Sequence, residues 1–172
     1  SFLENHVMKL FVTGICGRLG RAIAAEASLQ GHAVVGLDMQ PWPSGTPLPA
    51  GVETSVGSYE DMALVERLLK SCDSMIHTAG PNGAHVKKLS LAEFLRSNVE
   101  SVGCLLETAK RVGVRRMALS STMEVLIGRD WTTSSATVVD EDSPPRTDSA
   151  YSISRLLQEH LGREFSRIHG VS

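Results

Sequence analysis

Short, largely apolar runs alternate along the chain with longer segments in which apolar residues recur every three or four positions. A short apolar run is typical of a buried strand, and the longer spacing is typical of an amphipathic helix. The pattern predicts strands at residues 8–12, 33–37, 74–78 and 115–120. It predicts helices from residue 21 onward and over residues 60–70, 91–112 and 150–169. This alternation indicates an α/β fold, a Rossmann-type doubly wound parallel sheet with helices on both faces.

Two polar segments that contain proline interrupt the alternation. Residues 41–49 hold four prolines, a density that neither a helix nor a central strand tolerates. Residues 131–149 are polar and precede the last predicted helix, for which Ser149 is a suitable N-cap. We interpret both segments as surface loops.

Composition places the chain among ordinary globular domains. Its 172 residues are 42% hydrophobic and 21% charged, which is enough for one core. The net charge of −2 gives no reason to expect nucleic acid as a partner, and no apolar run approaches the roughly 20 residues that span a bilayer. Residues 1–7 do not resemble a signal peptide. We interpret them as an expression remnant or tail, and residues 8–172 as one domain.

The cysteines and histidines bear on the cellular location of the protein and on whether it binds a metal. Cys16, Cys72 and Cys104 are odd in number and far apart, which favours reduced thiols and a cytoplasmic location. The six histidines show no metal-ligand spacing, so no metal site is predicted. His77 ends a predicted strand, and we interpret it as structural.

The turn after the first strand carries the strongest functional signal. Glycines let the backbone turn tightly and let a pyrophosphate approach without a Cβ in the way. The helix that follows presents unpaired N–H groups and a partial positive charge to phosphates. The pattern therefore predicts a dinucleotide site, and the alternative is a turn that uses glycine for steric reasons alone. The predicted contacts in this turn are Gly14, Gly17, Arg18, Leu19 and Gly20.

Asp38 ends the second predicted strand, at the distance from the glycines that such a site requires. A carboxylate there accepts hydrogen bonds from both ribose hydroxyls of the adenosine half and repels a 2′-phosphate. The predicted cofactor is therefore NAD rather than NADP.

A second group of residues indicates proton transfer. Hydroxyl side chains at residues 120–122 end the fourth predicted strand, where ligands of such sheets lie. Tyr151 and Arg155 share one face of the last predicted helix. A neighbouring cation favours an ionised phenol, which can take a proton from an alcohol while hydride leaves the carbon for nicotinamide. The alternative is an ordinary amphipathic helix with a half-buried Tyr151 and a solvated Arg155.

These motifs together resemble the extended short-chain dehydrogenase/reductase family, which contains the NAD-dependent epimerases and dehydratases of nucleotide sugars. The resemblance covers the chain from about residue 8 onward, with residues 140–144 similar to the acidic segment before the family's catalytic tyrosine. It implies that Tyr151 is the general base, that Thr122 hydrogen-bonds the substrate hydroxyl, and that Arg155 holds the ribose. It also implies a sugar or nucleotide-sugar substrate and a homodimer formed by helices 91–112 and 150–169.

The resemblance implies further cofactor contacts at four places along the chain. These contacts lie at the end of the third predicted strand, in the predicted helix over residues 91–112, directly after residue 57, and at the end of the fourth predicted strand. The residues concerned are Thr78, Ala79, Gly80, Asn98, Ser58, Tyr59 and Ser120.

The chain departs from the family pattern at three points. Arg155 stands where the family has lysine, and its planar fork is broader than an ammonium. Ser58 stands where the family has an aspartate near the adenine. The chain also lacks the C-terminal region that completes the family's substrate pocket. Alternatives to an active oxidoreductase are therefore a non-catalytic NAD-binding sensor or scaffold module, or an ordered fragment of a longer enzyme. A serine hydrolase is disfavoured because the chain has no Gly-x-Ser-x-Gly elbow.

Overall fold

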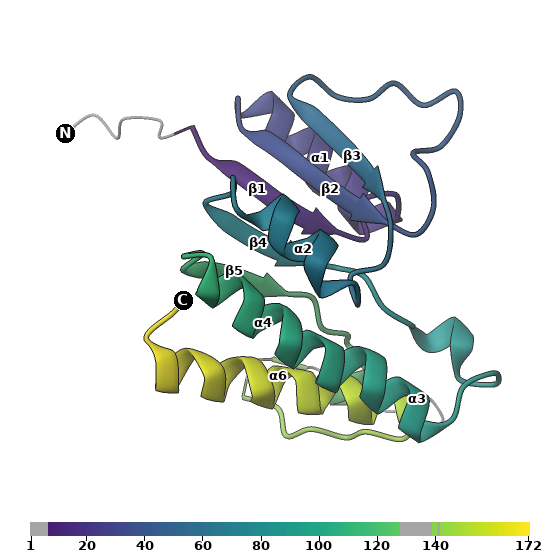
Figure 1. Ribbon diagram of the computed structural model, residues 1–172. Coiled ribbons are helices and arrows are strands. Elements are labelled where there is room, and N and C mark those ends of the chain that lie inside the picture. Colours follow the sequence, from purple (N-terminus) through teal and green to yellow (C-terminus); the bar gives the residue numbers. More distant parts are fainter. Residues whose placement is uncertain (1–6, 128–138, 141) are drawn as a thin grey trace.

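The structure is a computed structural model that describes residues 7–127, 139–140 and 142–172. Within these residues, five parallel strands form one sheet in the order β3-β2-β1-β4-β5 (Figure 1). The strands are β1 (Lys9–Thr13), β2 (Ala33–Asp38), β3 (Val52–Val56), β4 (Ser74–His77) and β5 (Arg116–Leu119). The α/β fold and its parallel sheet confirm the fold class predicted from the sequence.

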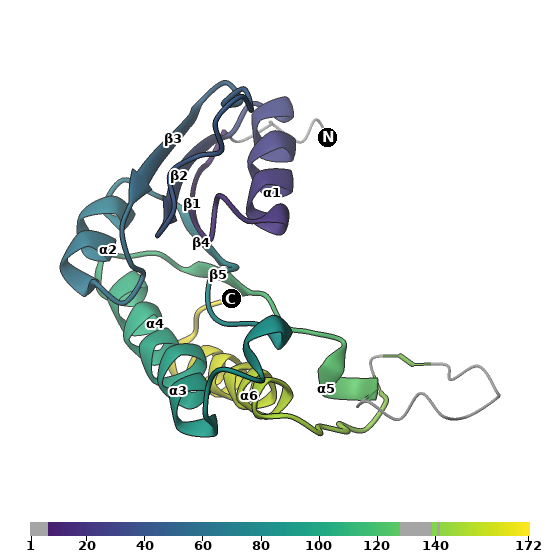
Figure 2. The same ribbon diagram turned by 90° about the vertical axis from the view of Figure 1, so that its right-hand side faces the viewer.

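Helices cover both faces of this sheet. Figure 2 shows α1 on one face and α2 on the other, with α4 and α6 on the same side as α2. The helices are α1 (Arg18–Leu29), α2 (Met62–Leu69), α3 (Leu91–Leu95), α4 (Ser101–Arg111), α5 (Glu124–Ile127) and α6 (Ala150–His169). A 3₁₀ turn, η1 (Gly83–His85), and a π-helical turn, η2 (Arg96–Glu100), complete the set.

The alternation of side chains along β1 divides the core into two layers. Phe11 packs into the layer beneath α2, α4 and α6, whereas Val12 packs against α1, and both side chains are fully buried. Successive residues of a strand point to opposite faces, so a strand covered on both sides is apolar throughout. This explains why the sequence pattern predicted β1 and β2 from continuous apolar runs.

The sequence pattern predicts four strands, and the structure corrects this number by adding β3. β3 lies at the edge of the sheet and pairs with β2 alone, in register Val34↔Val52. Only Val52 is buried among its five residues, because solvent covers most of its outer side. An edge strand of this kind lacks the apolar run that marks a central strand.

Two helices also differ from their predicted bounds. α1 begins at Arg18 rather than at residue 21, because Gly17 serves as its N-cap. The segment predicted as one helix at 91–112 contains the π-helical turn between α3 and α4. Ser149 caps α6 as predicted, since its side chain accepts a hydrogen bond from the Ser152 N–H.

The predicted loop at 41–49 contains no helix or strand, as expected. Residues 128–138 and 141, which fall in or next to the predicted loop at 131–149, lie outside the described residues, and so do residues 1–6 of the predicted tail. Cys16, Cys72 and Cys104 are all unpaired. In the described part of the chain, no helix combines the length and apolar character needed to cross a bilayer.

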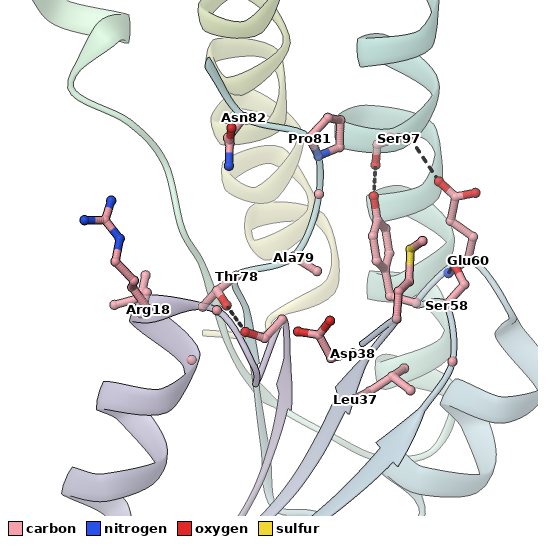
Figure 3. Close-up of a pocket in the computed structure, with 18 of the residues that line it drawn as sticks. Arg18, Leu37, Asp38, Ser58, Glu60, Thr78, Ala79, Pro81, Asn82 and Ser97 are labelled. Atoms are coloured by element: carbon pink, nitrogen blue, oxygen red, sulfur yellow. Dashed lines mark hydrogen bonds between the residues drawn. The ribbon is translucent and has the colours of Figure 1, made fainter. Parts of the chain in front are cut away.

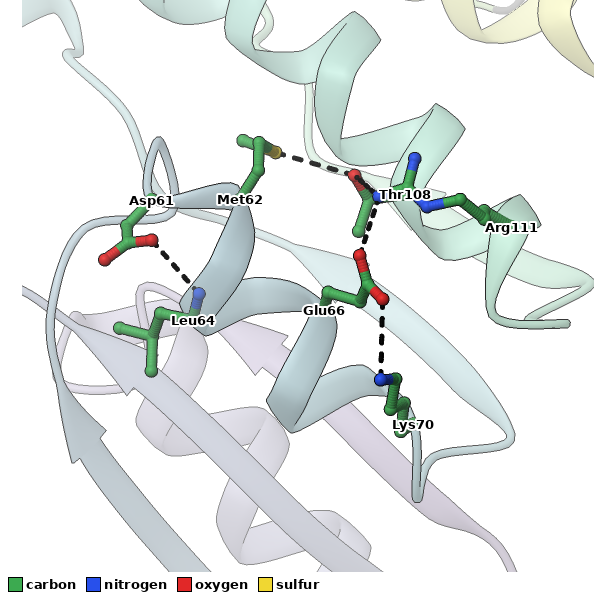
Figure 4. A network of polar contacts seen from close by, with 7 residues as sticks. All are labelled: Asp61, Met62, Leu64, Glu66, Lys70, Thr108 and Arg111. Carbon is green, nitrogen blue, oxygen red and sulfur yellow. Dashed lines mark hydrogen bonds and ion pairs between the residues drawn. The ribbon is translucent and has the colours of Figure 1, made fainter.

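Polar contacts tie α2 to α4 on the surface of the domain (Figure 4). Asp61 caps α2 by accepting a hydrogen bond from the Leu64 N–H at 3.0 Å. Glu66 of α2 accepts from Arg111 of α4 at 2.9 Å and pairs with Lys70 at 3.5 Å. Exposed pairs of this kind each contribute little stability. Glu66 thereby connects α2 to Arg111, the last residue of α4.

Candidate cofactor and active site

A pocket of about 980 Å³ opens at the carboxyl ends of the strands. The turn after β1, the end of β2 and the segments after β3 and β4 build its wall, together with Ser97 of η2 (Figure 3). Residues predicted from the sequence to bind the cofactor make up most of the lining. They are Gly14, Gly17, Arg18, Leu19, Gly20, Asp38, Ser58, Tyr59, Thr78, Ala79 and Gly80.

The glycines of the first turn are required by close backbone contacts. Gly14 has a φ of +75°, and a Cβ there would lie 2.7 Å from the Thr78 hydroxyl oxygen. A Cβ on Gly20 would overlap the carbonyl oxygen of Gly14. Any larger residue at Gly14 or Gly20 would push the turn out of the shape that forms the pocket floor.

The start of α1 is open toward this floor. Gly17 is the N-cap and supplies no capping side chain, and the first turn of the helix holds no acidic residue. The first N–H groups of a helix lack partners within the helix and carry a partial positive charge. Arg18, Leu19 and Gly20 line the pocket at this point. The pyrophosphate of a dinucleotide would fit this cradle, because no capping side chain competes for the N–H groups.

Asp38 is held rigidly at the end of β2. Its two carboxylate oxygens accept backbone hydrogen bonds from Cys16 and Gln40, each at 3.0 Å. A carboxylate has further acceptor sites beyond these two. In Figure 3 the carboxylate lies between the strand end at Thr78 and Ala79 and the segment of Ser58 and Glu60. The backbone bonds thus aim a fixed negative charge into the pocket.

Tyr59 lines the same side of the pocket and is buried. Its hydroxyl donates to the Ser97 carbonyl at 3.1 Å, and burial raises the pKa of Tyr59 to about 12. The Ser97 hydroxyl donates in turn to Glu60 at 3.0 Å. Tyr59 therefore acts as a neutral wall of the pocket rather than as a base.

His77 lies beneath the pocket with no exposed surface. Its Nδ1 is 2.7 Å from the Thr13 hydroxyl, and its ring meets Tyr59 edge to face at 5.0 Å. Burial, with a smaller contribution from the Arg155 charge, lowers the pKa of His77 to about 3. The imidazole is therefore neutral at physiological pH, in agreement with the structural role predicted for it.

The predicted catalytic residues lie outside the pocket lining. Arg155 is only 3% exposed, so the alternative of a solvated arginine is wrong. Its guanidinium carbon lies 5.5 Å from the centre of the Tyr151 ring, a cation–π contact. Tyr151 is also buried, and a Cβ on Gly83 would lie 3.7 Å from its ring. Tyr151 therefore adjoins η1, next to the pocket residue Asn82.

Thr122 and Ser120 occupy the loop after β5. The Thr122 hydroxyl accepts a hydrogen bond from the Glu124 N–H at 3.3 Å. Ser120 contributes its carbonyl oxygen, which accepts from Arg155 at 3.3 Å. The loop after β5 thus contacts α6 and the short α5, and neither residue lines the pocket.

Asn98 connects the two parts of the site. It is fully buried in η2, and its amide donates to the Ser154 hydroxyl at 2.9 Å and to the Pro81 carbonyl at 3.3 Å. Asn98 thus bridges the segment after β4 and α6 from within the π-helical turn. Gly80 has a φ of +113°, and a Cβ there would lie 2.7 Å from the Asn98 Oδ1 and 3.5 Å from the Arg155 Nη2. The pocket wall at Gly80 therefore lies close to Asn98 and to Arg155, one of the residues predicted to be catalytic.

Several lining residues were not predicted from the sequence. Most are neighbours in the chain of predicted residues, so the motif boundaries could have been drawn wider. Ser97 adjoins the predicted Asn98 in the chain, whereas His85 carries no such signal because only the tertiary fold brings η1 to the pocket. The unpredicted lining residues are Leu37, Met39, Gly57, Glu60, Pro81, Asn82, His85 and Ser97.

Comparisons with known proteins agree with this geometry. The model of the NAD dependent epimerase/dehydratase family matches residues 10–172. The UDP-glucose 4-epimerase of Streptomyces lividans is 25% identical over 166 residues, which cover 95% of this chain and 49% of that protein. The structure of MoeE5 in complex with UDP-glucose and NAD superposes with a TM-score of 0.76 at 29% identity, covering 92% of this chain and 49% of that one.

A short-chain dehydrogenase/reductase superfamily protein from Agrobacterium tumefaciens with bound NAD is also similar. It is 30% identical with a TM-score of 0.74, and the match covers 95% of this chain and 46% of that one. The chain thus spans about half the length of the relatives it matches.

Proposed function

Because this chain belongs to the NAD dependent epimerase/dehydratase family, we propose that it binds NAD and oxidises a hydroxyl group of a sugar or nucleotide sugar. One observation carries the proposal. The pocket is lined by the glycine turn and Asp38 on one side and by Gly80 on the other, where a Cβ on Gly80 would lie 3.5 Å from the Nη2 of the buried Arg155. A dinucleotide in this pocket would extend from Asp38 toward the Tyr151 end.

Two features of the chain fit NAD in particular. The open start of α1 suits a pyrophosphate, and the fixed Asp38 carboxylate suits two free ribose hydroxyls while it repels a 2′-phosphate. The adenine side lacks a carboxylate at Ser58, but Glu60 lines the pocket nearby.

The residues at the catalytic end would divide the work of proton transfer. Tyr151 accepts the hydroxyl proton of the substrate, and Thr122 hydrogen-bonds the same oxygen. Arg155 holds the ribose and places a positive charge beside the phenol. NAD, when bound, supplies a hydride acceptor, so the C–H electron pair leaves with the hydrogen and a carbonyl forms.

The test is a calorimetric titration with NAD, followed by absorbance at the reduced-nicotinamide band with a panel of nucleotide sugars and simple sugar acids. We expect binding of NAD and reduction with at least one substrate. Absence of NAD binding would overturn the proposal as a whole.

A second candidate function is a non-catalytic NAD-binding sensor or scaffold module. The observation that favours it is that the predicted catalytic residues Thr122, Tyr151 and Arg155 do not line the pocket that the predicted cofactor contacts form. NAD binding without turnover in the full reading-frame product would support this candidate. Intact mass and the encoded reading frame would show whether the chain is instead a fragment of a longer enzyme.

We also propose a two-fold dimer in which α4 and α6 pack against the same helices of a second copy. Leu157 of α6 is 42% exposed in the single chain, as an interface residue would be. Light scattering at high concentration should give twice the monomer mass, and a strict monomer would contradict this assembly.

A further inference from the structure

Gln158 lies on α6, one turn after Arg155, and has no exposed surface. Its Oε1 accepts a hydrogen bond from the Arg155 Nη1 at 2.8 Å. Its Nε2 donates to the Ser120 carbonyl at 3.1 Å, and the same carbonyl accepts from the Arg155 Nη1 at 3.3 Å. Gln158, Arg155 and Ser120 therefore form a closed ring of hydrogen bonds between α6 and the end of β5.

A buried amide is costly unless both of its ends are bonded. The two ends of Gln158 bind the two elements of the catalytic end, one through Arg155 and one through Ser120. An apolar side chain of similar volume would fill the same space without making either bond. The polarity of Gln158 therefore serves the guanidinium and the strand end rather than packing.

The ring determines which way the guanidinium faces. The group is planar, so fixing Nη1 also fixes the direction of Nη2. Nη2 lies on the side of Gly80, 3.5 Å from the position that a Cβ on this glycine would take. Gly80 lines the cofactor pocket, so the ring turns one amino group of Arg155 toward the pocket wall.

We propose that Gln158 is a positioning residue that aims the Arg155 guanidinium at the nicotinamide half of the cofactor site. This inference rests on the proposed function. Arg155 and Gln158 act as a matched pair, because a lysine at position 155 has a single nitrogen. One nitrogen cannot hold Gln158 and present a second donor in a fixed plane.

The first experiment compares NAD with ADP, which lacks the nicotinamide riboside, by calorimetry on wild type and Gln158→Leu. We expect Gln158→Leu to weaken NAD binding about threefold to tenfold, the loss of one or two buried hydrogen bonds, and to change ADP affinity less than twofold. Where a substrate is found, kcat should fall while its KM stays constant. Equal weakening of NAD and ADP, or no change in either, would overturn the proposal.

Phe165→Leu provides the matched control, because Phe165 is a buried core residue of the same helix away from the pocket lining. It should lower the melting temperature and leave both affinities unchanged. A similar melting temperature in Gln158→Leu would then show that a shift in NAD affinity does not come from loss of packing in α6.

The second experiment is a double-mutant cycle on NAD affinity with Arg155→Lys, Gln158→Leu and both together. A matched pair predicts that Gln158→Leu has less than a twofold effect once Arg155 is lysine. Independent effects that multiply would overturn the positioning role while wild-type NAD binding leaves the proposed function standing. A wild type that binds no NAD would overturn both.

Discussion

The two ends of the candidate site are built in different ways. The phosphate end consists of backbone, with glycines at contacts that exclude a Cβ and an uncapped helix start. The catalytic end consists of side chains from α6, the loop after β5 and η2, which meet only in the folded chain. In the proposed function, the first end would hold the pyrophosphate and the adenosine half, and the second end would hold the nicotinamide half and transfer the proton. Substitutions at the two ends should therefore change NAD binding and turnover in different proportions.

The largest expected effect comes from Tyr151→Phe. Removal of the only proposed proton acceptor should reduce turnover by about 10³-fold, within the range of general base catalysis. Affinity for NAD should change less than twofold, because the substitution removes only the hydroxyl and keeps the ring beside the Arg155 guanidinium. Stopped-flow and calorimetric measurements on the same sample check both values. Full activity would refute the proton-transfer mechanism, and a parallel loss of NAD binding would show that the two ends are not separable.

Gly20→Ala tests the phosphate end. The new Cβ would meet the Gly14 carbonyl, and a cost of about 3 kcal/mol corresponds to roughly 100-fold weaker NAD binding. Gly103→Ala is the matched control, since a Cβ there meets its nearest neighbour at 3.8 Å and alanine favours the helix. Calorimetry should show unchanged NAD affinity in the control. Equal affinities in the two variants would contradict the close-contact argument.

His77 lies between the two ends, in contact with Thr13 and lowered in pKa partly by Arg155. Between pH 6.5 and about 3 the unfolded chain binds a proton at this residue and the folded chain does not. The unfolding free energy should therefore fall as pH falls through this window, by up to about 1.4 kcal/mol per pH unit, or about 2 kcal/mol from pH 6.5 to 5.

Denaturant unfolding of wild type and His77→Gln at pH 7, 6 and 5 measures the contribution of His77 to this pH dependence. The variant should show a flatter dependence on pH over the same interval. Parallel curves for the two proteins would show that the acid sensitivity arises elsewhere.

The smallest effect concerns Asp38. NAD should bind at least about tenfold more tightly than NADP, a difference of about 1.4 kcal/mol, because the Asp38 carboxylate lines the pocket where the adenosine ribose would bind. Calorimetric titration with both cofactors measures the ratio. Equal affinity, or preference for NADP, would remove the assignment of Asp38 and with it one of the two supports for the phosphate end.

The sequence alone identified the glycine turn that lines the pocket, because its signal is local. Gly14, Gly17 and Gly20 lie within seven consecutive residues, so the pattern can be recognised without any residue distant in the chain. The catalytic end was predicted only as separate motifs. The burial of Arg155 depends on Gln158 and Ser120, which meet it only after α6 packs beside β5.

The edge strand β3 illustrates the same limit within the fold. Its residues are mostly polar and solvent covers one side, so no periodicity in the sequence distinguishes it from a loop. Only the backbone pairing with β2 defines it. Central strands can be recognised in the sequence because burial on both faces requires apolar residues throughout. An edge strand is exposed on one side and has no such requirement.

The π-helical turn η2 sets the rotational phase of everything that follows it in the long helix. A π turn accommodates one residue more than an α turn, and one residue corresponds to about 100° of rotation around the helix axis. The extra residue brings the apolar stripe of α4, which includes Val102 and Leu106, toward the same side as Phe94 of α3. The number of residues in Arg96–Glu100 is therefore a structural parameter in its own right. Deleting one residue from this segment would rotate the apolar stripe of α4 away from the sheet, although every remaining side chain would be unchanged.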